Sequence, residues 1–155
     1  MNGSLSIQNR QRDVRVNPRR LRRIMETLLG DLLNQHDYEL AIRLVSATEI
    51  TRINETYLGH QGVTDVITFD YARPEAGGGL VGDIVICAAE SVVQARRFHT
   101  PWPVELARYA VHGVLHLLGH DDRRARDRRR MKQLEDRLVR ELGRRFDLEQ
   151  LEAAR

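Results

Sequence analysis

Three of the six histidines of this chain fall within the run His112-Gly113-Val114-Leu115-His116-Leu117-Leu118-Gly119-His120-Asp121-Asp122. Apolar residues before and within this run recur at helical spacing, so the pattern predicts a long helix from Val104 to about Leu118 that ends at Gly119. Histidines at positions i and i+4 lie one above the other on a helix face, so both imidazoles can reach one metal ion. The apolar residues beside the two histidines place this face against the core, where a metal site is shielded.

A metal site of this kind needs a third protein ligand if its fourth position is to stay open to water. Asp122 lies three residues beyond the helix-ending Gly119, where a chain that reverses can return to the ion. We therefore expect His112, His116 and Asp122 to bind one divalent metal ion, with Zn²⁺ the expected species. His120 is the alternative third ligand, although on a continuous helix it would stand about 12 Å along the axis from His112.

The spacing does not identify the base that would activate a metal-bound water: the candidates are Asp121, His120 and Asp65. Neighbouring side chains of an extended loop point to opposite sides. If Asp122 binds the metal, Asp121 is therefore free to orient a ligand histidine or to take a proton, which makes it a candidate catalytic residue together with the two helical histidines. Asp65 is also a candidate substrate-binding residue, because aspartate is uncommon in strands such as the one predicted beside it.

The arginines of the chain are unevenly distributed, although the net charge is only +3. Seven arginines lie between Arg10 and Arg23, and six more lie between Arg123 and Arg130. Clusters of this kind suit a polyphosphate partner, and Arg124 and Arg128 in the second cluster are candidate substrate-binding residues. Solvated helix faces in an arginine-rich chain with a single lysine explain the clusters equally well.

The rest of the chain predicts an α+β domain. Apolar runs and turn residues predict strands over 40–45, 66–69 and 80–87 and helices over 18–35, 48–58, 88–98, 104–118 and 124–142. We expect a small mixed sheet of three to four strands packed with about five helices, with the metal site on a long central helix and in the loop after it. A length of 155 residues predicts one domain over 1–155, with a loosely held tail after about residue 143.

The composition is that of an ordinary globular protein, with 41% hydrophobic and 30% charged residues. Its longest apolar runs fall far short of the ~20 residues that a membrane span needs, and the first residues have no apolar segment of signal-peptide length. Cys87 is the only cysteine, which excludes an intrachain disulfide and a cysteine-based zinc site. We expect a cytoplasmic protein with no membrane contact.

The spacing His-x3-His-x2-Gly-x2-Asp is that of the metzincin metal site, in which aspartate sometimes replaces the third histidine. Gly113 stands where those peptidases carry the glutamate that activates water, which counts against a metallopeptidase. A structural alternative is a pair of core histidines satisfied by hydrogen bonds. Three histidines, a helix-ending glycine and two aspartates at this spacing favour the metal site.

The same run resembles the signature of the YbeY endoribonucleases, bacterial factors of ribosome maturation. Two further segments agree with that family in the order expected: Asn54-Glu55-Thr56-Tyr57 followed by Thr64-Asp65-Val66-Ile67-Thr68-Phe69, and Gly82-Asp83-Ile84-Val85-Ile86-Cys87. The resemblance implies a zinc-dependent endonuclease for single-stranded RNA that acts at the 3′ end of small-subunit ribosomal RNA and in ribosome quality control. It also implies the small ribosomal subunit as a partner, with ribosomal proteins or an assembly GTPase as further partners.

The chain departs from the pattern of that family at two positions. The usual third histidine falls on Asp122, whose oxygen is a harder ligand than imidazole, so the bound metal can differ or be held less tightly. Leu58 stands where the family often has an arginine, so a charge that steadies phosphate must come from elsewhere. Two alternative functions stay open: a metallopeptidase-like hydrolase, and a non-catalytic ribosome-assembly factor with a structural metal. An open fourth metal position counts against the second.

Overall fold

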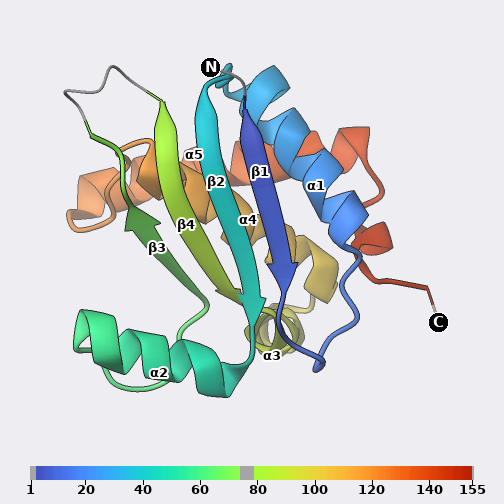
Figure 1. Ribbon diagram of the computed structural model, residues 1–155. Helices are drawn as coiled ribbons and strands as arrows, with labels where there is room; N and C mark the ends of the chain where they lie inside the picture. Colours follow the sequence, from blue (N-terminus) through green and yellow to red (C-terminus); the bar gives the residue numbers. More distant parts are fainter. Residues whose placement is uncertain (1–2, 74–78, 155) are drawn as a thin grey trace.

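The computed structural model of the protein describes residues 3–73 and 79–154. Its sheet has the strand order β1-β2-β4-β3. The strands are β1 (Ser4–Asn9), β2 (Tyr38–Val45), β3 (Val66–Asp70) and β4 (Leu80–Cys87). Strands β1 and β4 both run parallel to β2, whereas β3 pairs antiparallel with β4 at the edge of the sheet (Figure 1). The sheet is therefore mixed, as the sequence predicts.

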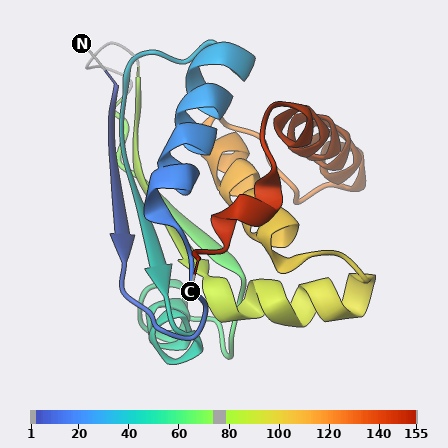
Figure 2. The ribbon, with the colours of Figure 1, turned by 90° about the vertical axis from the view of Figure 1, so that its right-hand side faces the viewer.

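The helices form two layers on one face of this sheet and also cover one end of it. They are α1 (Pro18–Glu26) with its π-helical continuation η1 (Thr27–Leu32), α2 (Ala47–Leu58), α3 (Ala88–Phe98), α4 (Trp102–Leu117), α5 (Ala125–Arg145) and the 3₁₀ helix η3 (Leu148–Leu151). Helices α1 and α4 lie next to the sheet and α5 lies outside them (Figure 2). Of the helices within the described ranges, none is long and apolar enough to cross a bilayer.

Local signals in the sequence account for where the first helices begin and end. The side chain of Asn17 accepts hydrogen bonds from the backbone N–H groups of Arg19 and Arg20, which caps α1. Ser46 caps α2 in the same way through the N–H of Glu49, at 3.1 Å. Gly59 then ends α2 at a φ of 68°, a left-handed conformation that glycine adopts without strain.

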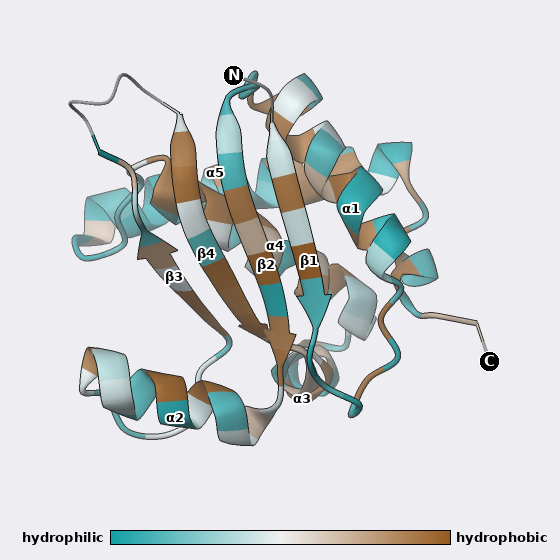
Figure 3. Cartoon of the chain, viewed as in Figure 1, coloured by the Kyte–Doolittle hydropathy of each residue, from teal (hydrophilic) through white to brown (hydrophobic). Residues whose placement is uncertain are grey.

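The main core lies between the sheet and α1, α4 and α5, and it includes the fully buried Leu21, Ile84 and Leu115. A smaller cluster lies on the other face, where Ile50 of α2 packs with Val45 of β2 and other residues at the carboxyl ends of the strands. In Figure 3 the strands carry much of the hydrophobic colour, whereas α5 is mostly hydrophilic on the side in view. Helix α4 is thus the buried central helix, and α5 is its solvent-facing cover.

Helix α4 approaches β4 closely at Gly113. A Cβ atom at this position would lie 2.6 Å from Cγ2 of Ile84, well inside van der Waals contact. No side chain fits between helix and strand at this point, and the contact fixes the height of α4 against the sheet. His112 and His116, on either side of Gly113 in the sequence, are thereby held beside the edge strand β3.

At the ends of the chain the structure adds one strand and corrects one expectation. Residues 4–9 form the fourth strand, which the sequence analysis did not place because only Leu5 and Ile7 give that segment an apolar face. The last helix runs through Gly143 to Arg145, and the tail beyond it is packed rather than loosely held. Leu151 is fully buried in η3, and its carbonyl accepts a hydrogen bond from the N–H of Asn17 at 2.7 Å.

Candidate metal centre

The chain reverses direction at the end of α4, as the predicted loop requires. Gly119 has a φ of 98°, its N–H donates to the carbonyl of His116, and the N–H of His120 donates to the carbonyl of Leu115, both at 3.0 Å. These paired bonds form the Schellman motif, in which glycine takes the left-handed position that other residues adopt only with strain. The turn sends the next residues back along the side of α4, so Asp122 faces the two helical histidines.

His112, His116 and Asp122 offer ligand atoms that all lie within 4.8 Å of one another. The two Nε2 atoms are 3.0 Å apart, and Nε2 of His116 is 3.7 Å from Oδ2 of Asp122. Tetrahedral coordination with metal–ligand bonds of ~2.0–2.2 Å puts ligand atoms about 3.3 Å apart, so these separations fit one ion. Two imidazoles and one carboxylate are also a donor set that Zn²⁺ accepts with a fourth position left for water.

Glu135 of α5 holds His112 in the orientation that a metal ligand needs. Its Oε1 lies 2.8 Å from Nδ1 of His112, so Nδ1–H donates to the carboxylate and Nε2 keeps a free lone pair. Its other oxygen accepts from Arg108 of α4 at 3.0 Å, and Lys132 lies 3.7 Å away. The carboxylate is only 8% exposed, so three cationic or donor groups share one nearly buried charge. A carboxylate–histidine pair of this kind is typical of protein metal sites.

The protonation of the two histidines follows from these neighbours. Burial alone would lower the pKa of His112, but the hydrogen bond and negative charge of Glu135 outweigh it and raise that pKa above its ordinary value. Burial and the adjacent His112 lower the pKa of His116. The pKa of Glu135 is lowered despite its burial, because His112 and Arg108 both donate to it. The two Nε2 atoms face one another at 3.0 Å, and both can serve as metal ligands once neither carries a proton.

The centre opens into a cavity of about 750 Å³, which we call the loop cavity. It is lined by Asn54, Leu58, His60, Thr64, Asp65, Val66, Ile67, Thr68, His112, His116, Gly119, His120, Asp121, Asp122 and Arg123. His112, His116 and Asp122 are 27%, 28% and 48% exposed, so a ligand in this cavity can reach them directly. The residues can thus hold an ion at the wall of a cavity that admits water and a larger substrate.

Comparison with known proteins places the chain among proteins of one family. A family model described as endoribonuclease YbeY matches residues 6–143. The chain belongs to the YbeY family. Proteins named endoribonuclease YbeY include one from Chlorobium luteolum, 39% identical over 79% of this chain and 86% of the relative, and one from Syntrophotalea carbinolica, 36% identical over 88% and 93%. A third, from an Anaeromyxobacter species, is 39% identical, and the match spans 72% of this chain but 58% of that longer protein.

A solved structure shares the fold. The solution structure of TM1509 from Thermotoga maritima aligns with 97% of this chain and 97% of its own, with a TM-score of 0.67. The two sequences are 23% identical, so the similarity supports the order and packing of the elements. The predicted α+β architecture, a small mixed sheet of three to four strands packed with about five helices, is confirmed, and the sheet has four strands.

The structure brings most of the other predicted residues to the centre. Asp65 lines the loop cavity at the start of β3, where its Oδ1 accepts from the N–H of Val66 at 2.7 Å. His120 and Asp121 line the same cavity, and Asp121 accepts from the N–H of Arg123 at 2.9 Å. None of the three belongs to the group of close ligand atoms found among the described residues.

The two predicted substrate-binding arginines are placed differently. Arg128 lies near the centre, where its guanidinium donates to the carbonyls of Arg123, at 3.1 Å, and Asp122. Arg124 occupies the N-cap position of α5 and lines no cavity beside the centre within the described residues. The arginines of this run therefore lie on two faces of the chain segment, some toward the candidate metal centre and others toward solvent.

Glu135 was missed by the sequence analysis, although a signal for it was present. Residues 131, 135, 138 and 142 recur at the spacing of one helix face, and Met131, Leu138 and Leu142 are buried with Glu135 among them. A carboxylate in an apolar helix stripe needs a partner, since an unpaired buried charge is costly. Arg108 and His112 on α4 are those partners.

Proposed function

We propose that this protein is a metal-dependent endoribonuclease that hydrolyses phosphodiester bonds of single-stranded RNA. The observation that carries the proposal is the close group of His112, His116 and Asp122 at the wall of the open loop cavity. Membership of a family whose proteins are named as endoribonucleases supplies the substrate class. Zn²⁺ as the ion, the 3′ end of small-subunit ribosomal RNA, the ribosomal partners, ribosome quality control and the cytoplasm stay predictions of the sequence.

His112, His116 and Asp122 would hold the ion, and Glu135 fixes the ring of His112 so that Nε2 faces it. A bound divalent ion supplies Lewis acidity to the phosphoryl oxygens and lowers the pKa of a coordinated water toward ~7. Hydrolysis breaks one P–O bond, so a base takes a proton from the attacking water and an acid gives one to the leaving oxygen. Asp121, which lines the cavity, is our candidate for this proton transfer.

The metallopeptidase alternative meets a steric obstacle. Peptidases with this histidine spacing carry their water-activating glutamate at the position of Gly113. Here that position faces Ile84 of β4, and a Cβ atom would already lie 2.6 Å from it. The packing of α4 on the sheet therefore leaves no room for a glutamate at this point. The non-catalytic alternative is opposed by the exposed ligand atoms, because structural metal sites are typically closed by four protein ligands.

Incubation of the metal-loaded protein with end-labelled RNA tests the proposal. We expect cleavage of single strands, weak action on a duplex of the same sequence, and loss of both cleavage and metal in His116→Ala. His36→Ala is the matched control, because His36 is exposed and its ring contacts Asn34, away from the centre. Asp121→Asn is expected to keep the metal and cleave slowly. Cleavage that survives a chelator, robust hydrolysis of casein, or metal binding without any RNA cleavage would each contradict the proposal.

A further inference from the structure

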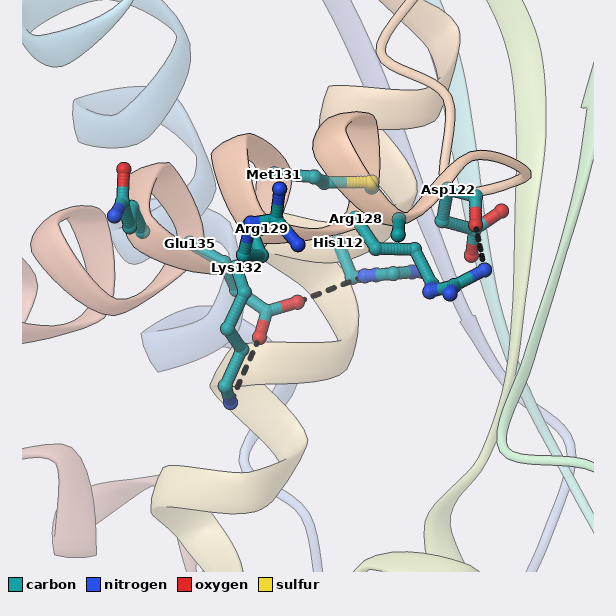
Figure 4. A pocket seen from close by; sticks show the side chains of 9 residues that line it. His112, Asp122, Arg128, Arg129, Met131, Lys132 and Glu135 are labelled. Atoms are coloured by element: carbon teal, nitrogen blue, oxygen red, sulfur yellow. Dashed lines mark hydrogen bonds and ion pairs between the residues drawn. The ribbon is translucent and has the colours of Figure 1, made fainter.

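A second cavity, of about 590 Å³, opens on the other side of His112. It is lined by His112, Asp122, Ala125, Arg128, Arg129, Met131, Lys132, Gln133 and Glu135, and we call it the α5 pocket. His112 and Asp122 also line the loop cavity, so the two spaces meet at the metal centre. In Figure 4 the Glu135 carboxylate lies between Lys132 and the His112 imidazole, and Arg128, on the other side of that ring, is directed toward Asp122.

The charges of the two spaces differ. The loop cavity carries three aspartates and one arginine, Arg123, whose guanidinium already lies 3.9 Å from Asp121. The α5 pocket carries Arg128, Arg129 and Lys132 against two carboxylates. One of these carboxylates, Glu135, is already occupied by His112 and Arg108. A phosphate chain that reaches the metal centre is therefore attracted toward α5 rather than toward the loop cavity.

Arg129 is the cation of this pocket that is most available to a ligand. Lys132 lies within 4 Å of Glu135 and Asp136, and Arg128 donates to backbone carbonyls of the metal loop. Over residues 3–73 and 79–154, the side chain of Arg129 makes no hydrogen bond or ion pair. Its guanidinium is thus free to bind an incoming phosphate, with the geometry that makes arginine a good phosphate ligand.

The pocket also has an apolar part. Ala125 is exposed beside the cations, and Met131, which is 2% exposed, lines the pocket with the edge of an otherwise buried side chain. A free phosphate makes no favourable contact with apolar surface, whereas a nucleotide carries a flat base that can pack against it. Its volume lies within the ~300–1,000 Å³ of ordinary small-ligand pockets. The combination of cationic rim and apolar floor, adjoining the metal centre, matches one nucleotide unit.

We propose that the α5 pocket is a nucleotide subsite, which holds the nucleotide next to the scissile phosphodiester with its phosphate on Arg129 and Arg128 and its base against Met131 and Ala125. The proposal rests on the ribonuclease function proposed above and deepens it. A base can enter the pocket only when it is unstacked and unpaired, as bases of single-stranded RNA are. The subsite therefore supplies a physical reason for selection of single strands, and it provides the phosphate contact that Leu58 does not.

The first test measures RNA binding without catalysis. Fluorescence anisotropy with a labelled single-stranded RNA, in the presence of a chelator, gives the affinity and its salt dependence for Arg129→Glu and Arg130→Glu. The two variants carry the same charge change on adjacent residues of α5, and only Arg129 lines the pocket. We expect Arg129→Glu to bind about fivefold to tenfold more weakly than Arg130→Glu. Its plot of log affinity against log salt should be shallower by about 0.7, the loss of one phosphate contact.

The second test concerns the base. RNAs that each carry one abasic nucleotide at a different position around the cleavage site are cleaved by the metal-loaded protein. We expect KM to rise for one position next to the cleaved bond and to change little for the others.

The outcomes separate this subsite from the ribonuclease function itself. Equal weakening by Arg129→Glu and Arg130→Glu, in a protein that binds and cleaves RNA, would overturn the subsite and leave the function standing. An abasic scan with no sensitive position would overturn the placement of the base. A wild-type protein that neither binds nor cleaves RNA would overturn both proposals.

Discussion

Replacement of Glu135 by glutamine tests whether this residue orients the metal centre. The carboxylate accepts from Nδ1–H of His112 with one oxygen, at 2.8 Å, and from Arg108 with the other, at 3.0 Å. Glutamine has one acceptor and one donor end. Whichever way the amide turns, its N–H₂ group faces either the guanidinium or His112. In the second case Nδ1 must become an acceptor, and the proton moves to Nε2, where a metal ligand cannot carry it.

The expected cost follows from the loss of this orientation. Removal of a carboxylate partner from a ligand histidine typically weakens metal binding about tenfold to 100-fold, or about 1.4–2.8 kcal/mol. We expect Glu135→Gln to fall in this range while the protein stays folded, because Arg108 keeps its 2.6 Å hydrogen bond to Asp136. Titration with a competing chelator of known affinity gives the metal dissociation constant. Circular dichroism of the metal-free variant reports separately on folding.

Asp136→Asn is the matched control for this experiment. Asp136 contacts the same Arg108 and Lys132 but does not touch His112. We expect its metal affinity to stay within about threefold of wild type, since it supports no ligand directly. Wild-type metal affinity in Glu135→Gln would refute the orienting role. An equal loss in the two variants would show that the charge near α5, rather than the hydrogen bond to His112, sets the affinity.

Two further sets of substitutions probe the third ligand and the packing of α4. Asp122→Ala is expected to lose the metal. Asp122→His and His120→Ala are expected to keep it, because imidazole can replace the carboxylate ligand and His120 is no ligand. Elemental analysis of the purified variants tests this, and an empty site in His120→Ala alone would make His120 the third ligand. Gly113→Ala should lower the free energy of unfolding by about 1–3 kcal/mol, since its Cβ would lie 2.6 Å from Ile84. Gly143→Ala, with its nearest atom 3.9 Å away, should raise that free energy by about 0.4–1 kcal/mol. Urea unfolding measures both changes, and an equal effect of the two alanines would contradict the packing argument.

The parts of the centre that follow from local geometry could be predicted from the sequence. The i, i+4 spacing of His112 and His116 fixes their common face, and Gly119 fixes the reversal that returns Asp122. Glu135 lies 23 residues after His112, and only the packing of α5 on α4 brings the two side chains together. That packing is a tertiary property, so spacing alone could not reveal the partner of the histidine or the pocket beside it.

The errors at the ends of the chain have similar causes. A glycine such as Gly143 after an amphipathic segment is typical of a helix end, but the last turn of α5 continues past it to Arg145. Phe146 packs against the core and Leu148 is buried in it, and these contacts outweigh the cost of about 1 kcal/mol for glycine within a helix. Strand β1 is held by its pairing with β2, such as that of Leu5 with Leu40. An edge strand with few apolar residues leaves little trace in the sequence pattern.

The order of the elements along the chain also governs when the centre can exist during synthesis. Strand β2 pairs with β1 and β4 in parallel, and each pairing closes a long intervening segment. Such pairings between distant residues make folding slow. The strands up to Cys87 leave the ribosome before α4 and α5, which cover their apolar face. These two helices and the loop between them carry the candidate ligands His112, His116 and Asp122 and the partner Glu135. At ~5–20 residues per second, roughly 3–12 s separate the last strand from the end of α5. The group of His112, His116 and Asp122, with Glu135 beside it, therefore cannot assemble until all four strands and both of these helices have been synthesised.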